Sequence, residues 1–379
     1  MCHADTERWK TICEEKAGFR IIHSPDLLVG ALRQGWDPVC AVRRAVWLFR
    51  EKPAYDIIHC LDTRPAVVLP SLLYARAMGI RIVSDWIDWW GRGGLIRDKR
   101  PLWYRALFGW FETFFEEYFR SRLDGLTAIS AALLERGVKL GVSPSRCFRI
   151  SGGADMDTFA DVPSKEESRR ALGIAPGADV VCFSGLDVLI DLPLAVDACA
   201  RVAAVRPGAV LLLVGPTQTL ARKLAASSSS PIEIVCTGPV PHAMLPKYLA
   251  AADVFLMPYT DKVSNIGRWP NKIGDYMSVG RPTVSNPIGE VKWLFERFDV
   301  GTLADGTAES MGDAVLALLN DPERASTIGR RARATAVEVF AWERLIEDLE
   351  SWYYRILSMG APVRDEPPLA AGIGGPGAR

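Results

Sequence analysis

The chain has 379 residues, and its 45 Lys and Arg residues balance its 45 Asp and Glu residues, so its formal net charge is zero. This length suits two domains that each bury a core, and the charge balance excludes a general attraction to nucleic acid or to an anionic membrane. The eight cysteines form no close pair and no apolar run reaches the roughly 18 residues of a membrane span, so we expect a reduced, cytoplasmic protein without structural zinc.

Short β-rich runs alternate with segments of helical periodicity along the chain, which predicts parallel βαβ units and an α/β fold. The predicted strands lie at residues 19–22, 56–60, 81–85, 125–129, 180–184, 210–214, 232–236 and 254–258. The first half offers four or five strands, against about six in the second half. No opening strand with a glycine-rich turn and a helix is found near the amino terminus, so we expect either a shortened first domain or a lost chain start.

The segment RPLWYRALFGWFETFFEEYFRSRL, residues 100–123, predicts a helix that is aromatic on much of its surface. Basic residues lie before and within its start, at Arg97, Lys99, Arg100 and Arg105. Weak peripheral docking at the inner face of a membrane would suit an enzyme with a lipid-linked acceptor. A buried amphipathic helix explains the same pattern, and we favour it because Glu112, Glu116 and Glu117 would repel anionic lipid.

A break between two series of βα units falls near residues 151–173, which are rich in Gly, Pro and charged residues. We therefore place a first domain at residues 1–155 and a second at residues 156–340. The pair Asp155 and Asp157 copies a metal-binding Asp-x-Asp motif of a different fold, but it lies in this break. We expect it to cap a local turn or helix instead.

The segment RWPNKIGDYMSVGRPTV, residues 268–284, predicts a short helix followed at once by a strand. Pro270 suits the start of the helix, Gly280 suits its end, and Pro282 begins an extended run. A helix that starts here presents free backbone N–H groups, and in an open parallel sheet such helix ends line the ligand crevice.

Side chains with complementary chemistry gather at this helix start. Arg268, Asn271 and Lys272 supply donors that suit a phosphate, and Asp275 could accept hydrogen bonds from hydroxyl groups one turn later. A nucleotide-sugar would satisfy both features. The alternative is that Lys272 and Asp275 form only a surface ion pair.

The carboxyl-terminal part of the chain ends in one predicted helix and a tail. The helix, residues 341–357, carries an apolar stripe of Leu345, Leu349, Trp352 and Ile356, which should pack back onto the first domain. Residues 358–379 are too rich in Gly and Pro to fold, so we expect them to be disordered.

The run PNKIGDYMSVGRPTVSN resembles the donor-site segment of the retaining, glycogen-synthase-like family 4 glycosyltransferases, in the subgroup with a Pro-x-Lys-x-x-Glu-Tyr-Met pattern. ISGGADMDTF, residues 150–159, resembles that family's interdomain turn. Residues 235–259 resemble its strand, Gly-x-Val loop and helix that lead to Ala-Asp-Val-x-x-x-Pro, and FAWERLIEDLESWYYRIL resembles its closing helix. The likeness covers residues 55–357 and is strongest after residue 150.

This resemblance implies a GT-B enzyme with two Rossmann-like domains that face a cleft. Such an enzyme moves a sugar from a nucleotide-diphosphate sugar to a hydroxyl acceptor, usually with retention of the anomeric configuration, in glycan, glycolipid or glycoside biosynthesis. No metal or other cofactor is expected, because cations and backbone amides can carry the charge of the leaving diphosphate. No nucleic-acid partner is expected either.

Carried over by position, the resemblance implies that the loop from Gly238 to Val240 meets the nucleobase and that Asp275 accepts the ribose hydroxyls. Lys272 and Arg268 would neutralise the diphosphate. The further candidates for donor binding are Gly185, Asn265, Asn271 and Gly289.

The segment SDWIDWWGRGG occupies the place of the family's acceptor-side loop, although Ile87 stands where relatives often have a histidine. Asp85 and Asp88 are the candidates to hold hydroxyl groups of acceptor or sugar, and Trp89 or Trp90 could stack on a sugar face. The alternative is that the tryptophans fill the core and the aspartates cap turns.

The sequence departs from the family at two positions. Gly267 stands where the first of two glutamates is usual, and Leu186 stands where a basic residue is frequent; Arg268 and Lys272 could compensate. Two other functions stay open: a sugar-nucleotide epimerase of the same fold, which would need acid and base side chains that the sequence does not identify, and a catalytically degenerate nucleotide-sugar-binding subunit.

Overall fold

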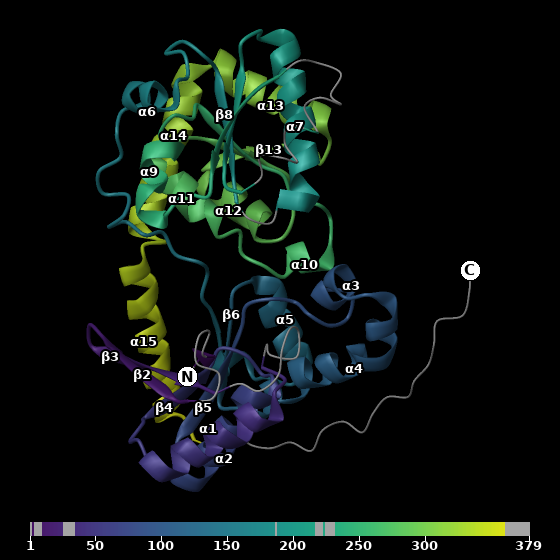
Figure 1. Cartoon of the computed structure of the whole chain (residues 1–379), viewed down its shortest axis with the longest axis vertical. Coiled ribbons are helices and arrows are strands. Elements are labelled where there is room, and N and C mark those ends of the chain that lie inside the picture. The colour runs from purple at the N-terminus through teal and green to yellow at the C-terminus, as the bar shows by residue number, and fades with distance from the viewer. Residues whose placement is uncertain are drawn as a thin grey trace.

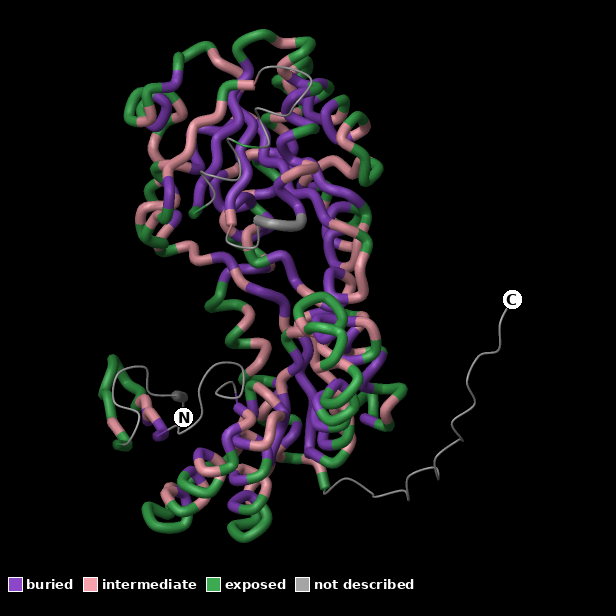
Figure 2. The backbone as a smooth tube through the Cα atoms, turned by 45° about the vertical axis from the view of Figure 1, so that its right-hand side comes forward, coloured by how far each residue is buried: buried purple, intermediate pink, exposed green. Residues whose placement is uncertain are grey.

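The computed structural model describes residues 2–3, 10–25, 35–185, 188–216, 223 and 232–360. These residues form two lobes, each built around a parallel β-sheet (Figure 1). The buried backbone runs through the sheets of both lobes, whereas many outer helices and turns are exposed (Figure 2). None of the described helices combines the length and the apolar character that crossing a membrane requires.

The first lobe contains a four-stranded sheet in the order β4-β5-β6-β7, and all neighbouring strands are parallel. Its strands are β4 (Ile57–Cys60), β5 (Arg81–Trp86), β6 (Gly125–Ala128) and β7 (Cys147–Arg149). Its helices are α1 (Pro38–Glu51), α2 (Pro65–Met78), α3 (Leu95–Lys99), α4 (Leu102–Tyr118) and α5 (Ala131–Lys139), with 3-10 turns at Arg120–Arg122 and Pro144–Arg146. The three strands predicted from residue 56 to residue 129 are confirmed. Strand β7 escapes prediction because three residues carry too little hydrophobic pattern.

The second lobe contains a six-stranded parallel sheet in the order β10-β9-β8-β11-β12-β13. Its strands are β8 (Val180–Ser184), β9 (Val210–Val214), β10 (Glu233–Gly238), β11 (Val254–Met257), β12 (Thr283–Ser285) and β13 (Gly301–Leu303). Its helices are α6 (Lys165–Leu172), α7 (Val188–Val205), α9 (Leu245–Leu249), α10 (Val263–Ile266), α11 (Lys272–Val279), α12 (Glu290–Phe298), α13 (Ala308–Asn320) and α14 (Pro322–Glu338), with a 3-10 turn at His242–Met244. The strand order reverses between β8 and β11, and a ligand crevice is expected beyond the carboxyl ends of such a pair.

A small third sheet precedes the first lobe. It has the order β1-β3-β2, with β1 (Cys2–His3), β2 (Ile12–Lys16) and β3 (Phe19–Ser24). Strand β3 pairs antiparallel with β2 through a tight turn in which Gly18 has a φ of 86°. The assignment of residues 19–22 to a series of parallel βαβ units is therefore wrong, because this strand pairs with β2 in a hairpin and with the two-residue β1 in a separate sheet.

Helix α4 has one inner and one outer face. Its inner face contributes Phe115 to a core cluster with Cys60 and Val68. The opposite face is exposed and carries the side chains of Trp103 and Trp110, which are 61% and 67% accessible. The expectation that this helix is buried is thus wrong for its outer face.

Helix α11 is held against the end of the second sheet by its apolar side. The ring of Tyr276 stacks on Phe255 of β11 with centroids 4.0 Å apart, and its hydroxyl accepts a hydrogen bond from the Ser184 amide at 2.8 Å. Gly280 ends the helix with a φ of 75°, in the left-handed region that favours glycine. These contacts fix the direction in which the first turn of α11 points, toward the space between the lobes.

The chain passes between the lobes twice, and the two passages touch. The Ala154 amide donates a hydrogen bond to the Phe340 carbonyl at 2.6 Å. Gly153 lies so close to the ring of Trp342 that an added Cβ would be 2.4 Å from it, which explains why glycine is required at this point. Helix α15 (Trp342–Ser358) then runs along the first lobe, where Trp352 is fully buried. Residues 361–379, most of the predicted tail, lie outside the described residues, as does Leu186.

Candidate functional site

A cavity of about 920 Å³ lies between the two lobes. Its first-lobe wall includes residues at the carboxyl ends of β4 and β5, and its second-lobe wall includes residues at the ends of β8, β9 and β10 and the start of α11. Of the predicted site residues, it brings together Asp85, Gly185, Val240, Asn271, Lys272 and Asp275. The two parallel sheets therefore direct their carboxyl edges toward one shared space, where ligands of such sheets bind.

Lys272 marks the cationic part of the second-lobe wall. Its ammonium nitrogen lies 4.3 Å from the centroid of the Phe183 ring, over the carboxyl end of β8. An added Cβ at Gly185, where φ is 140°, would be 3.2 Å from this ammonium. The absence of a side chain at Gly185 therefore leaves room for the Lys272 ammonium beside the strand end, next to the backbone amides that begin α11.

Asp275 lies one turn farther along α11 and is partly buried. Burial raises the pKa of its carboxyl group from 3.8 to about 6, with Asp155 adding to the rise and His242 opposing it. The carboxylate therefore stays mostly ionised at neutral pH but takes up a proton in mildly acidic solution. The charged groups that act on Asp275, His242 and Asp155, both line the cavity. The alternative of a simple surface ion pair between Asp275 and Lys272 therefore does not describe its environment.

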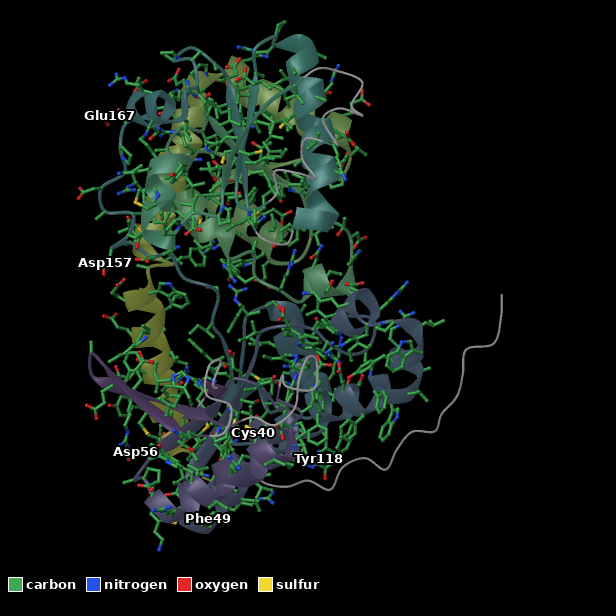
Figure 3. The ribbon with its side chains drawn as sticks, viewed as in Figure 1. Cys40, Phe49, Asp56, Tyr118, Asp157 and Glu167 are labelled. Atoms are coloured by element: carbon green, nitrogen blue, oxygen red, sulfur yellow. The ribbon has the colours of Figure 1, made fainter. Side chains whose placement is uncertain are left out.

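Asp155 is held by a local turn. Its carboxylate accepts hydrogen bonds from the Thr158 amide at 3.0 Å and from the Thr158 hydroxyl at 2.8 Å, and it lies 3.1 Å from His242 Nε2. Asp157 lies apart from it, at the outer edge of the passage between the lobes (Figure 3). The capping interpretation of this pair fits Asp155, which caps a turn.

The loop after β10 reaches the cavity through Val240. Gly238, the last residue of β10, has a φ of 72° and forms a bridge with Gly215, which directly follows β9. It does not itself belong to the cavity wall, whereas Pro239 and Val240 do. The turn at Gly238 thus directs the following two apolar residues toward the cavity.

Three predicted donor residues lie elsewhere in the second lobe. Arg268 has its guanidinium 3.8 Å from the Asp191 carboxylate. The Asn265 amide nitrogen donates to the Thr260 carbonyl at 2.6 Å, and an added Cβ at Gly289 would be 3.0 Å from the Asn265 carbonyl oxygen. None of the three is among the residues that line the cavity in the described structure.

A hydrogen-bonded chain of four side chains forms on the first-lobe wall. The Thr127 hydroxyl donates to Asp85 Oδ1 at 2.6 Å, so it accepts from His59 Nε2, which is 3.1 Å away. His59 Nδ1 then accepts from the Tyr353 hydroxyl at 2.5 Å. Burial lowers the pKa of His59, in agreement with the neutral imidazole that this pattern requires.

This chain orients the one predicted acceptor-side residue that reaches the cavity, Asp85. His59 and Tyr353 also line the cavity, although neither was predicted from the sequence. The position of His59 in a predicted strand that ends at residue 60 was a usable signal, because carboxyl ends of parallel strands carry functional side chains. Tyr353 had no such signal, because it lies 294 residues away from its partner.

In the described structure, the tryptophans of the loop after Asp85 pack against other residues, whereas Ile87 of the same loop lines the cavity. An added Cβ at Gly267 would lie 2.7 Å from the Trp89 Cβ, and the Arg136 guanidinium lies 4.6 Å from the Trp89 ring. Trp90 and Asp88 are also outside the cavity wall. The packing alternative therefore describes these tryptophans. A glutamate at position 267 would collide with Trp89, which explains the glycine there.

Part of the chain is similar in sequence to a known protein family and to several characterised enzymes. Residues 178–321 match the family of Glycosyl transferases group 1. The chain is 27% identical over 238 residues to the GDP-mannose-dependent alpha-(1-6)-phosphatidylinositol monomannoside mannosyltransferase of Mycolicibacterium smegmatis, a match that covers 61% of this chain and 58% of that protein. It is 26% identical over 250 residues to the D-inositol 3-phosphate glycosyltransferase of Kineococcus radiotolerans, covering 60% and 56%. The match thus spans less than two thirds of either relative's length.

Solved structures agree with the fold. Sucrose-phosphate synthase of Thermosynechococcus elongatus superposes with a TM-score of 0.71 at 16% identity, over 94% of this chain and 88% of that chain. The Anabaena protein HepE in complex with UDP and glucose superposes with a TM-score of 0.65 at 18% identity, over 88% and 85%. The expected GT-B architecture with two Rossmann-like sheets is therefore confirmed.

Proposed function

We propose that this chain is a glycosyltransferase that moves a sugar from a nucleotide-diphosphate sugar to a hydroxyl acceptor, with retention of the anomeric configuration. The observation that carries the proposal is the shared cavity, which has Lys272 and Asp275 on one wall and Asp85 on the other. The match of residues 178–321 to group 1 glycosyl transferases and the sugar-transferring relatives support the proposal.

Each wall has a role in this proposal. Lys272 and the amino-terminal end of the α11 dipole hold the diphosphate and stabilise the negative charge that develops as it leaves. Asp275 accepts hydrogen bonds from the ribose, and Val240 contacts the nucleobase. Asp85, oriented by Thr127, accepts a hydrogen bond from a hydroxyl of the acceptor or the transferred sugar. Because Lys272 supplies the positive charge, we expect transfer without a metal ion.

Calorimetric titration with UDP, GDP and ADP tests the donor side, first without metal and then with magnesium. We expect one nucleotide to bind in both conditions. Lys272→Ala should weaken its binding by about 1 to 3 kcal/mol, because a charge-assisted hydrogen bond to phosphate is lost. Arg268→Ala should have a smaller effect, because Arg268 lies beside Asp191 and outside the cavity wall. Lys247→Ala, an exposed lysine of α9, is the matched control. Equal binding by all four proteins would refute the donor site.

Product analysis with the sugar form of that nucleotide separates the three candidate functions. A transferase releases nucleoside diphosphate and gains turnover when acceptors are added. An epimerase converts the donor into an isomer and leaves the diphosphate bond to the sugar intact. A degenerate subunit binds the donor and gives neither product.

A further inference from the structure

The outer face of α4 has an unusual composition. All nine exposed residues of this helix are apolar or aromatic: Leu102, Trp103, Ala106, Leu107, Phe108, Trp110, Phe111, Phe114 and Tyr118. At 1.5 Å per residue the 17-residue helix is about 25 Å long, so these side chains form an extended apolar surface. Contiguous apolar surface of this kind marks an interaction site.

The three glutamates of α4 point inward, where each has hydrogen-bond donors. Glu112 and Glu116 are both 5% accessible, and Glu117 is partly buried. Glu112 accepts a hydrogen bond from the Tyr104 hydroxyl and Glu116 accepts one from the Gly91 amide, both at 2.6 Å. Glu117 accepts one from the Arg136 guanidinium, also at 2.6 Å. The expectation that these carboxylates would repel anionic lipid is therefore wrong, because none of them belongs to the outer face.

Basic side chains flank the apolar face at both ends. Arg97 and Lys99 are exposed just before α4, Arg105 is near its start, and Arg122 is exposed just after its end. Arg105 and Arg122 donate hydrogen bonds to backbone carbonyls, at 3.3 Å and 2.6 Å. The nearby Asp98 accepts a hydrogen bond from the Ser264 hydroxyl of the second lobe at 2.6 Å. The surface therefore combines an apolar centre with a cationic rim.

We propose that α4 docks the protein on an anionic lipid surface. The helix would lie in the plane of the interface, with its aromatic face at the boundary between headgroups and acyl chains and the basic rim on lipid phosphates. Figure 1 shows α4 at the outer side of the first lobe, away from α15. The cationic rim favours lipid over a second copy of this chain, whose own α4 would bring the same charges.

The docking surface is connected to the cavity by a short segment. The Glu116 carboxylate of α4 accepts hydrogen bonds from the amides of Trp90 and Gly91 at 2.8 Å and 2.6 Å. These residues follow Asp85 of the cavity wall by only a few positions. If the proposed function is correct, an acceptor carried by a lipid would enter from this side; the docking itself does not depend on that function.

Co-sedimentation of the full chain with vesicles tests this proposal. One set of vesicles contains phosphatidylglycerol mixed with phosphatidylcholine, and the other contains phosphatidylcholine alone. We expect at least tenfold stronger binding to the anionic vesicles at 0.1 M salt, and weaker binding at 0.5 M salt because charge attraction is screened. Trp103→Glu together with Trp110→Glu should reduce binding at least tenfold. Val205→Glu, at a 53% accessible position of α7 in the second lobe, is the control and should bind as wild type.

A second variant tests the rim independently. Arg97→Gln together with Lys99→Gln should lower binding to anionic vesicles several-fold and reduce its salt dependence. Circular dichroism and nucleotide titration establish that each variant is folded and that its donor site is intact. Wild-type protein that ignores anionic vesicles, or a tryptophan variant that binds them as well as wild type, overturns the proposal. A dimer that becomes monomeric in the tryptophan variant, with no vesicle binding, assigns the surface to a second copy.

Discussion

Asp275 couples the chemistry of the proposed donor site to stability. Burial raises the pKa of its carboxyl group from 3.8 to about 6, so between these pH values the folded protein binds more protons than the unfolded chain. The free energy of unfolding therefore falls as pH rises through this window. Asp275→Asn removes that penalty, so we expect the variant to be more stable than wild type at pH 7.5, by up to about 3 kcal/mol, and similar at pH 4.

Urea denaturation of wild type and Asp275→Asn at pH 4, 5, 6 and 7.5 measures this difference. Asp157→Asn, at an exposed position in the passage between the lobes, serves as the control and should show no such trend. A stability difference that does not change with pH would contradict the assignment. Asp275→Asn should also bind the nucleotide more weakly than wild type, so its stability and its nucleotide affinity change in opposite directions.

The candidate site was partly predictable from single residues. Lys272 and Asp275 follow from a local signal, the start of a short helix, and Asp85 follows from the end of a strand. Arg268 was predicted from the same helix start, and Asn265 was assigned by position in a motif. A motif records which residue is present but not where its side chain points, and both of these contact their own lobe.

Single elements show the same limit. The parallel strands of four or more residues were found because their pattern is local, whereas β7 and β13, with three residues each, were missed; β12 is equally short and was predicted only because it directly follows α11. The periodicity of α4 correctly predicted a helix but assigned its aromatic face to the interior. Periodicity gives the faces of a helix, and only the neighbouring elements decide which face is covered.

Helix α15 belongs to the second half of the sequence but completes the wall of the first lobe. Its Tyr353 hydroxyl donates to His59 Nδ1 and so holds the imidazole, which donates to the Thr127 hydroxyl; that hydroxyl in turn donates to Asp85. Tyr353→Phe removes this hydroxyl, so the partly buried His59 Nδ1 loses its hydrogen-bond donor. We expect a loss of about 1 to 2 kcal/mol in unfolding free energy and a similar loss of transition-state stabilisation, with nucleotide affinity unchanged.

Denaturation, nucleotide titration and steady-state kinetics on Tyr353→Phe measure the three quantities. Tyr354→Phe is the matched control, because the neighbouring ring is 65% accessible on the same helix. Should the two variants behave alike, Tyr353 has no positioning role. A changed pH profile of turnover in Tyr353→Phe alone would separate positioning of His59 from a purely structural contribution.

The sequence predicts two parallel-sheet lobes but does not predict which residues join them. Their contacts depend on residues with no pattern of their own. The Ser130 hydroxyl of the first lobe donates to the Gly267 carbonyl of the second at 2.9 Å, and Gly267 packs against Trp89. None of these positions identifies its partner in the sequence, because the partner is distant along the chain.

Glu290, the first residue of α12, makes the most polar of these contacts. Its carboxylate accepts hydrogen bonds from the Ala131 amide at 2.7 Å and from the Arg149 guanidinium at 3.2 Å, both in the first lobe. It is 4% accessible, so its removal leaves an amide and a cation without this acceptor in a buried interface.

Glu290→Ala should destabilise the closed arrangement of the lobes by about 3 kcal/mol. Small-angle scattering should then show a larger radius of gyration, and turnover should fall at least tenfold while nucleotide affinity stays within a factor of two, because the donor wall lies within the second lobe. Glu296→Ala, at an exposed position of the same helix, should change none of these quantities. An unchanged radius with unchanged turnover would show that the lobes are held together elsewhere. Lost nucleotide binding would instead place Glu290 in the donor site.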